Sequence, residues 1–206
     1  RAILRFALRD SAIIEASATQ RMVDYVGNEK IPVPARLVAA YYLARAKEIK
    51  IDSAQAVTIG LGFVRAINAP EVRAQIAIAL SKSNTSPAFG MLSKVIKTEK
   101  DWRVTCEIIK TLGEFPYDTA RVLVAEKLYD PNPHVSRAAA DFFVKNGKPQ
   151  DGQWYARMVR DNPTWPAPMQ IALYHAANKN LTFWGDSTAK SDVNWRLKQL
   201  FQQSKN

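Results

Sequence analysis

The sequence predicts an all-α protein, arranged as a right-handed α-solenoid of about five helical hairpins with an aromatic-rich C-terminal cap. Three observations support this prediction. A helix with the same apolar positions recurs along the chain at intervals of 30 to 37 residues. The apolar residues between these helices follow helical rather than alternating spacing. Only 8 of the 206 residues are glycine while 47% are hydrophobic, a composition that suits packed helices better than sheets and turns.

The recurring helices each open at an anchor residue, which is an arginine in four cases and a glutamine in the fifth. The anchors are Arg36, Arg73, Arg103, Arg137 and Gln170. The residues one, three, five and six positions after each anchor are apolar, with His175 as the one exception. These positions share one face of a helix, so each anchored helix is predicted to bury that face. Arg1 has the same pattern behind it, and the chain is therefore expected to begin inside a repeat.

Each anchored helix has a start signal and a partner helix. Asn68, Asp101 and Asn132 are expected N-caps, because Asn and Asp side chains accept hydrogen bonds from the first N–H groups of a helix. Partner helices are expected over residues 53–67, 86–96, 118–128 and 151–159. In the first of these, the residues at helical spacing are Ala54, Val57, Leu61 and Val64. The breakers between helices are too short for interdomain linkers, so one continuous domain is expected over residues 1–206.

The segment after residue 178 differs from the repeats in residues 1–178. Residues 179–206 are rich in aromatic side chains and end in an amphipathic helix from about Ser191. Because a terminal repeat must cover the open end of the core, this segment is predicted to be a cap. The alternative is that Trp165, Trp184 and Trp195 line a peptide-binding surface, since aromatic residues anchor interfaces.

The anchored helices resemble the first helix of HEAT repeats, in which an Asp or Pro precedes Val-Arg and a run of alanines. Residues 68–73, 101–104 and 130–140 show this signature, and the resemblance covers the chain from Arg1 to about Asn178. The spacing is shorter than the roughly 40 to 47 residues of eukaryotic units and is similar to compact bacterial HEAT-like repeats. In that family the arginine bridges to the next repeat. The resemblance therefore implies a structural role for Arg36, Arg73, Arg103 and Arg137.

A narrower resemblance concerns residues 100–117 and 130–135. They are similar to HEAT-like regions that accompany a cyclophilin-type prolyl isomerase domain in some multidomain bacterial proteins. The resemblance implies a non-catalytic accessory region that presents a surface to a protein or an extended peptide, beside an isomerase domain in the same parent chain. No segment of this sequence looks like the cyclophilin barrel, so no isomerase residue is transferred to it.

The net charge of +10 supports an alternative function. A basic solenoid can bind along a phosphate backbone, as bacterial HEAT-like glycosylases that remove alkylated bases from DNA do. The densest basic patch consists of Lys82, Lys94, Lys97 and Lys100. Aromatic residues are not interleaved with these lysines for base stacking. A solvated helix face, available to a protein partner, is therefore the favoured interpretation, and nucleic-acid binding is the alternative.

The sequence predicts no catalytic, cofactor or metal site. His134, His175 and the single cysteine, Cys106, cannot supply a zinc site, and Cys106 is expected in the core. Gly60 and Gly62 lack the third glycine of a dinucleotide motif and are expected to permit close helix packing. No apolar run approaches the roughly 18 residues of a membrane span. A soluble protein without membrane insertion is expected, in a compartment that the sequence leaves open and that is compatible with the bacterial cell envelope or periplasm.

Overall fold

The computed structural model describes residues 16–46, 49–66 and 69–148, together with residues 151, 154, 158, 161, 195 and 202. All regular structure in these residues is helical, which confirms the all-α prediction. The chain divides into two compact units, Arg1–Ala120 and Arg121–Asn206. The single continuous domain expected over residues 1–206 stays a prediction.

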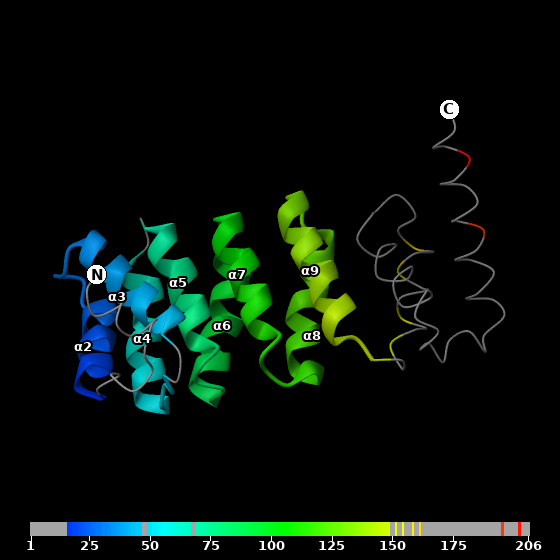
Figure 1. Cartoon of the computed structure of the whole chain (residues 1–206). Coiled ribbons are helices and arrows are strands. Elements are labelled where there is room, and N and C mark those ends of the chain that lie inside the picture. The colour runs from blue at the N-terminus through cyan, green and yellow to red at the C-terminus, as the bar shows by residue number, and fades with distance from the viewer. Residues whose placement is uncertain are drawn as a thin grey trace. The chain divides into compact units, whose positions relative to one another are not determined.

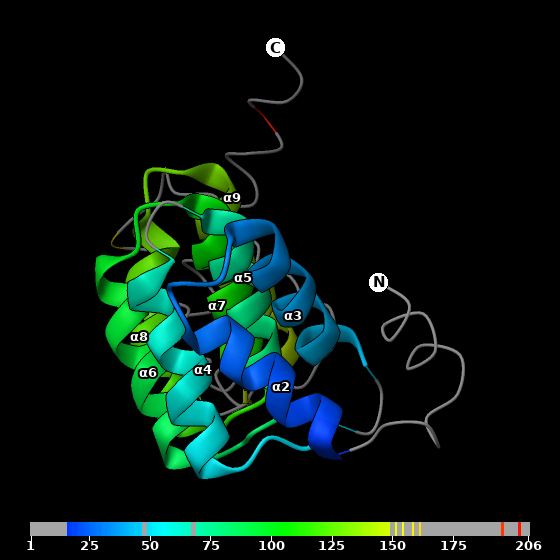
Figure 2. The same cartoon turned by 90° about the vertical axis from the view of Figure 1, so that its left-hand side faces the viewer.

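In the first unit, alternate helices pack in two rows. One row has α3 against α5 and α5 against α7, and the other has α2 against α4 and α4 against α6 (Figures 1 and 2). Three consecutive pairs also pack across the rows, namely α2 with α3, α4 with α5 and α6 with α7. The helices are α2 (Ala16–Gly27), α3 (Val33–Arg45), α4 (Ser53–Arg65), α5 (Pro70–Leu80), α6 (Ser86–Thr98) and α7 (Trp102–Leu112).

Helix α8 (Tyr117–Ala125) begins in the first unit and ends in the second. The helix expected over residues 118–128 ends at Ala125 and continues as a 3₁₀ helix, η2 (Glu126–Tyr129). Helix α9 (Pro133–Asn146) packs against η2. The ring centroid of Phe143, on α9, lies 5.2 Å from that of Phe142 and 5.1 Å from that of Trp154. These edge-to-face contacts help to bury this part of the second unit.

Two of the three expected N-caps can be compared with the structure. The side chain of Asp101 accepts a hydrogen bond from the N–H of Arg103 at 2.9 Å, and that of Asn132 accepts one from the N–H of His134 at 2.9 Å, so both expected N-caps are confirmed. Asn68, the third expected N-cap, lies outside the described residues; α5 begins at Pro70, and the residue before it, Ala69, has no side chain that can cap the helix. Proline presets the backbone for a helix start without a side-chain cap.

The anchored helices bury most of the predicted face. The positions three and six after the anchors are buried in every helix that the structure describes. Tyr41, five positions after Arg36, departs from the prediction and is 40% exposed. Its ring lies 5.5 Å from the guanidinium carbon of the exposed Arg45, within the range of a cation–π contact. The helix anchored at Gln170, with His175, lies outside the described residues.

Two glycines allow α2 and α4 to pack closely. A Cβ on Gly62 would lie 2.7 Å from Cδ1 of Ile76 and 3.0 Å from Cγ1 of Val26. A Cβ on Gly27 would lie 2.9 Å from the carbonyl oxygen of Thr58. These approaches confirm the expectation that glycine on α4 permits close packing, and they add Gly27 on the facing helix.

The substitution Gly27→Ala should lower the free energy of unfolding by about 1 to 3 kcal/mol, because the backbone of Thr58 cannot move away without shifting α4. Gly90→Ala is the matched control. No heavy atom lies within 4 Å of a Cβ at Gly90, which is inside α6, so alanine there should stabilise the protein by about 0.5 to 1 kcal/mol through helix propensity. Urea denaturation measures the unfolding free energy of both variants. Changes of the same sign in the two variants would contradict the close packing of Gly27 against Thr58.

Candidate functional site

Helix α4 presents an apolar stripe to solvent. Val57, Leu61 and Val64 are 49%, 39% and 70% exposed, and Ala54 extends the stripe by one turn. The buried side of the helix is formed instead by Ala56, Ile59, Gly60, Gly62 and Phe63. The residues whose spacing predicts this helix therefore lie on its outer side. A contiguous apolar stripe on the surface of a folded protein is typical of an interaction site.

One edge of the stripe faces α6. A Cβ on Gly60 would lie 2.9 Å from Cε of Met91, so this side of α4 is directed at α6. Val57 precedes Gly60 by three residues and Val64 follows it by four, which places both valines next to Gly60 at this edge of the stripe. Lys94 follows Met91 by three residues and is exposed on the side of α6 that faces α4.

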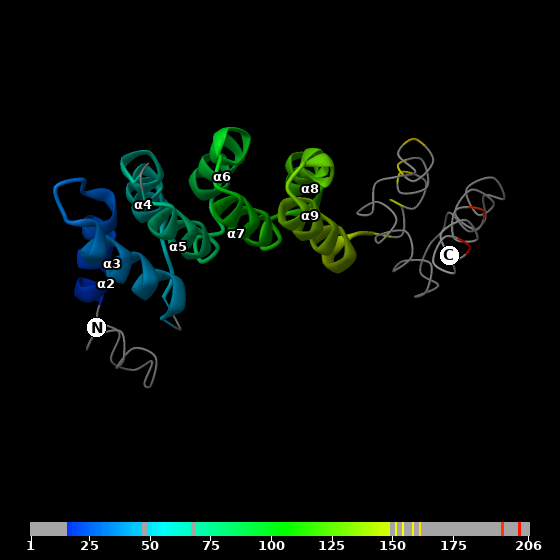
Figure 3. The ribbon, with the colours of Figure 1, turned by 90° about the horizontal axis from the view of Figure 1, so that it is seen from above.

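Helices α4 and α6 lie side by side in their row (Figure 3). Lys97 is exposed in the last turn of α6, and Lys100 is exposed just after the helix. We call the surface formed by these two helices the α4–α6 face. It consists of Val57, Leu61, Val64, Met91, Lys94 and Lys97.

Lys82 does not join the other three lysines of the predicted basic patch. Its ammonium group donates a hydrogen bond to the carbonyl oxygen of Ala46, at the end of α3. Burial, and then the nearby charge of Arg45, lower the pKa of Lys82 below its usual value. Lys82 also precedes the start of α6, whereas Lys97 lies in its last turn, roughly 15 Å further along the axis.

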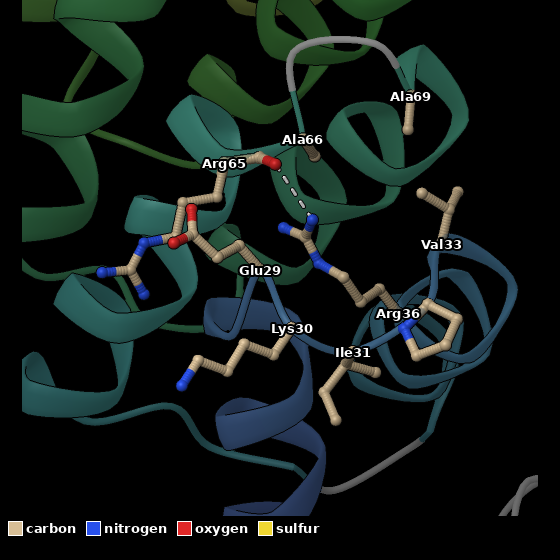
Figure 4. A pocket seen from close by; sticks show the side chains of 9 residues that line it. Glu29, Lys30, Ile31, Val33, Arg36, Arg65, Ala66 and Ala69 are labelled. Atoms are coloured by element: carbon tan, nitrogen blue, oxygen red, sulfur yellow. Dashed lines mark hydrogen bonds between the residues drawn. The ribbon is translucent and has the colours of Figure 1, made fainter.

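The anchor Arg36 is buried, with 2% of its surface exposed, and it binds the ends of two helices. Its Nε and Nη2 donate to the carbonyl oxygen of Val26 at 3.2 and 3.0 Å, and its Nη1 donates to that of Arg65 at 3.0 Å (Figure 4). Nη2 also lies 3.5 Å from the carbonyl oxygen of Gly62. A helix C-terminus has partial negative charge, so the guanidinium suits this position.

Burial lowers the pKa of Arg36, as does the charge of Arg65, while Glu29 raises it. The guanidinium nevertheless stays charged at any pH at which proteins fold.

The anchor Arg73 is also buried, and it forms an ion pair. Its Nε and Nη2 donate to the carboxylate of Glu99 at 2.8 and 2.9 Å, and its Nη1 donates to the carbonyl oxygen of Ala66 at 2.9 Å. Burial by itself raises the pKa of Glu99. The hydrogen bonds from Arg73 and from the N–H groups of Asp101 and Lys100 outweigh burial, so the pKa of Glu99 lies below its usual value.

The other two anchors lie at the surface. Arg103 donates to the carboxylate of Asp101 at 2.7 Å, and its Nη1 lies 3.8 Å from the carboxylate of Glu71. The hydrogen bond from Arg103 lowers the pKa of Asp101. Arg137 is exposed on α9. The four arginines therefore occupy equivalent positions in the sequence but have different surroundings.

A pocket of about 290 Å³ lies beside Arg36, between the α2–α3 connection and the junction of α4 and α5 (Figure 4). Its charged lining residues are Glu29, Lys30, Arg36 and Arg65, and its other lining residues are apolar. Arg36 donates to backbone carbonyls as described above, and Arg65 donates to the carbonyl oxygen of Gly27. The guanidinium groups are thus engaged in holding helix ends.

The structure describes only some of the remaining predicted residues. Cys106 is buried, as expected, and His134 is exposed. Trp165, Trp184 and the cap segment 179–206 lie outside the described residues, apart from Gln202 and the exposed Trp195. In the described part of the chain, no group of three or more His, Cys, Asp and Glu side chains is placed to hold a metal ion. Each helix described there is too short or too polar to cross a membrane.

A scan against protein-family models found no match, and searches of curated proteins and of solved structures found no significant similarity. The resemblance to HEAT-like repeats stays a prediction from the sequence.

Proposed function

We propose that this chain is a non-catalytic scaffold that binds a protein or a peptide, arranged as a right-handed α-solenoid of about five HEAT-like hairpins. The exposed stripe of Val57, Leu61 and Val64 is the observation that supports this function most directly. Exposed apolar side chains favour association with another apolar surface, because association removes them from water. The two rows of alternating helices in the first unit are compatible with stacked hairpins.

The sequence resemblance favours a scaffold that works beside a cyclophilin-type prolyl isomerase domain in a larger bacterial protein. In that arrangement the helical region binds a protein and the isomerase domain acts on it. The binding surface then raises the effective concentration of the bound protein at the isomerase domain and takes no part in the reaction itself.

The second candidate function is nucleic-acid binding, in the manner of the alkylated-DNA glycosylases. Lys97 and Lys100 are both exposed near the end of α6, and the exposed Trp102 follows them at the start of α7. Lysines can contact phosphates and a tryptophan can stack on a base. The carboxylates of Glu71, Glu99 and Asp101 lie in the same region and pair with Arg73 and Arg103, so these groups together offer no positive charge to a polyanion.

The two functions predict different results in binding experiments with the whole chain. An unbiased peptide library displayed on phage should yield sequences that bind the chain with affinities on the order of micromolar and a weak dependence on salt. Duplex and single-stranded DNA should bind weakly across about 50 to 200 mM salt. If the library yields no binders and DNA binds tightly with an affinity that falls steeply with salt, the scaffold function is refuted and nucleic-acid binding takes its place.

A further inference from the structure

The α4–α6 face suits a helix better than an extended peptide. The backbone groups inside α4 and α6 are bonded within their own helices, so the face has no row of free N–H and C=O groups for a strand to pair with. An extended peptide on this apolar surface would find no backbone partners there for its own N–H and C=O groups. A helix satisfies its backbone internally and needs only an apolar stripe to bind.

The stripe has the spacing of helical anchors. Val57, Leu61 and Val64 follow one another at intervals of four and three residues, over about 10 Å of the axis of α4. Met91 is half-buried beside them, and its flexible thioether can adapt to an incoming side chain. Apolar side chains at the same intervals on a second helix would lie along this stripe.

The two edges of the stripe differ in charge. The edge toward α6 has the exposed ammonium groups of Lys94 and Lys97. On α2, at the other edge, Gln20 donates to the carboxylate of Asp24 at 2.9 Å and accepts a hydrogen bond from Gln55 of α4 at 3.1 Å. The edge toward α6 therefore has two ammonium groups, whereas the edge toward α2 combines the carboxylate of Asp24 with the guanidinium of Arg65, which donates to the carbonyl oxygen of Gly27. A partner that complements both edges has carboxylates along one side of its apolar stripe only.

We propose that the α4–α6 face binds an amphipathic helix of a partner protein, and that acidic residues of this helix lie against Lys94 and Lys97. This inference rests on the proposed scaffold function and specifies its partner. The basic edge fixes the rotation of the bound helix about its axis, while the apolar stripe supplies most of the affinity.

The experiment is a selection from a library of stabilised helical peptides of about 20 residues, with the whole chain as bait. The selected peptides should share apolar residues at helical intervals and Asp or Glu along one edge. In anisotropy titrations, Val64→Ser and Lys94→Glu should each lower the affinity of the chain for the selected peptides by about tenfold or more. Replacing the acidic edge of a peptide by lysine should weaken binding to the native chain and strengthen binding to Lys94→Glu.

The matched control variants are Val122→Ser, an exposed valine on α8, and Lys110→Glu, an exposed lysine on α7. Both should bind the selected peptides like the native chain. Because all four substituted side chains are exposed, the variants should fold, and circular dichroism checks this.

Selected peptides that bind Val64→Ser and Lys94→Glu as tightly as the native chain would overturn this inference and leave the scaffold function in place. A preference of the α4–α6 face for anionic vesicles or DNA over every helical peptide would also overturn it. The absence of any bound peptide, from this library and from the unbiased one, would instead refute the scaffold function itself.

Discussion

Replacing Glu99 by glutamine should lower the free energy of unfolding at neutral pH by about 3 kcal/mol. The side chains of Arg73 and Glu99 are both at least nine-tenths buried, at 10% and 5% exposure. The substitution leaves the guanidinium of Arg73 in the same place without an opposite charge. Breaking a buried ion pair from one side is costly, because the remaining charge has lost its water and its partner. Urea denaturation measures the change.

Two comparisons isolate the ion pair. Arg103→Gln removes the equivalent anchor of α7. The ion pairs of Arg103 lie at the surface, so this substitution should change the stability little. The double substitution Arg73→Met with Glu99→Leu should recover much of the loss, because apolar side chains of similar volume need no counter-charge. A Glu99→Gln variant no less stable than Arg103→Gln would contradict the assignment of Glu99 as the buried partner.

The same pair should make stability depend on pH. The pKa of Glu99 in the folded protein lies below its ordinary value of 4.5, so the folded state favours the ionised carboxylate. The stabilisation is complete above pH 4.5 and is lost as the pH falls through the folded-state pKa. The difference in unfolding free energy between the native chain and Glu99→Gln should therefore shrink steadily in acid. A difference in unfolding free energy that stays constant with pH would show that the ionisation of Glu99 does not contribute to stability.

Replacing Arg36 by methionine should cost about 3 kcal/mol of stability. The carbonyl oxygens of Val26 and Arg65 would lose the donors that join the ends of α2 and α4 to α3. Arg36→Lys should restore only part of the loss, because one ammonium group cannot reproduce the fork of the guanidinium. Thermal denaturation followed by circular dichroism compares the variants.

Arg137→Met is the matched control for Arg36, since Arg137 has the same place in the sequence pattern but is exposed on α9. It should leave the melting temperature nearly unchanged. Equal losses for Arg36→Met and Arg137→Met would contradict the importance of burial, and equal stability of Arg36→Lys and the native chain would contradict the role of the fork.

Helices and caps could be predicted from the sequence because their signals are local. The caps at Asp101 and Asn132 depend on residues two positions away, and the periodicity of each helix lies within it. The orientation of α4 could not be predicted in this way, because both of its sides are apolar. Its contacts with α2 and α6, made close by Gly62 and Gly60, decide which side is buried.

The surroundings of the four anchor arginines could not be predicted from local sequence signals either. The sequence pattern treats them as equivalent, whereas Arg36 and Arg73 are buried and Arg103 and Arg137 are exposed. The carboxylate that pairs with Arg73 lies 26 residues away, on Glu99, and no spacing rule links the two. The exposed stripe of α4 could likewise not be predicted, because Val57 and Val64 have the spacing of core residues and only the packed neighbours show that they are exposed.

Arg36, Arg65 and Lys82 each reach from one pair of helices to a main-chain carbonyl oxygen of a neighbouring pair. Every amino acid supplies that acceptor, so these hydrogen bonds by themselves make no demand on the side chain of the accepting residue. Only the packing around them, as at Gly27, restricts which residue can stand there. The pairing of Arg73 with Glu99 requires one particular side chain, and it fixes which helix pair can follow at that junction.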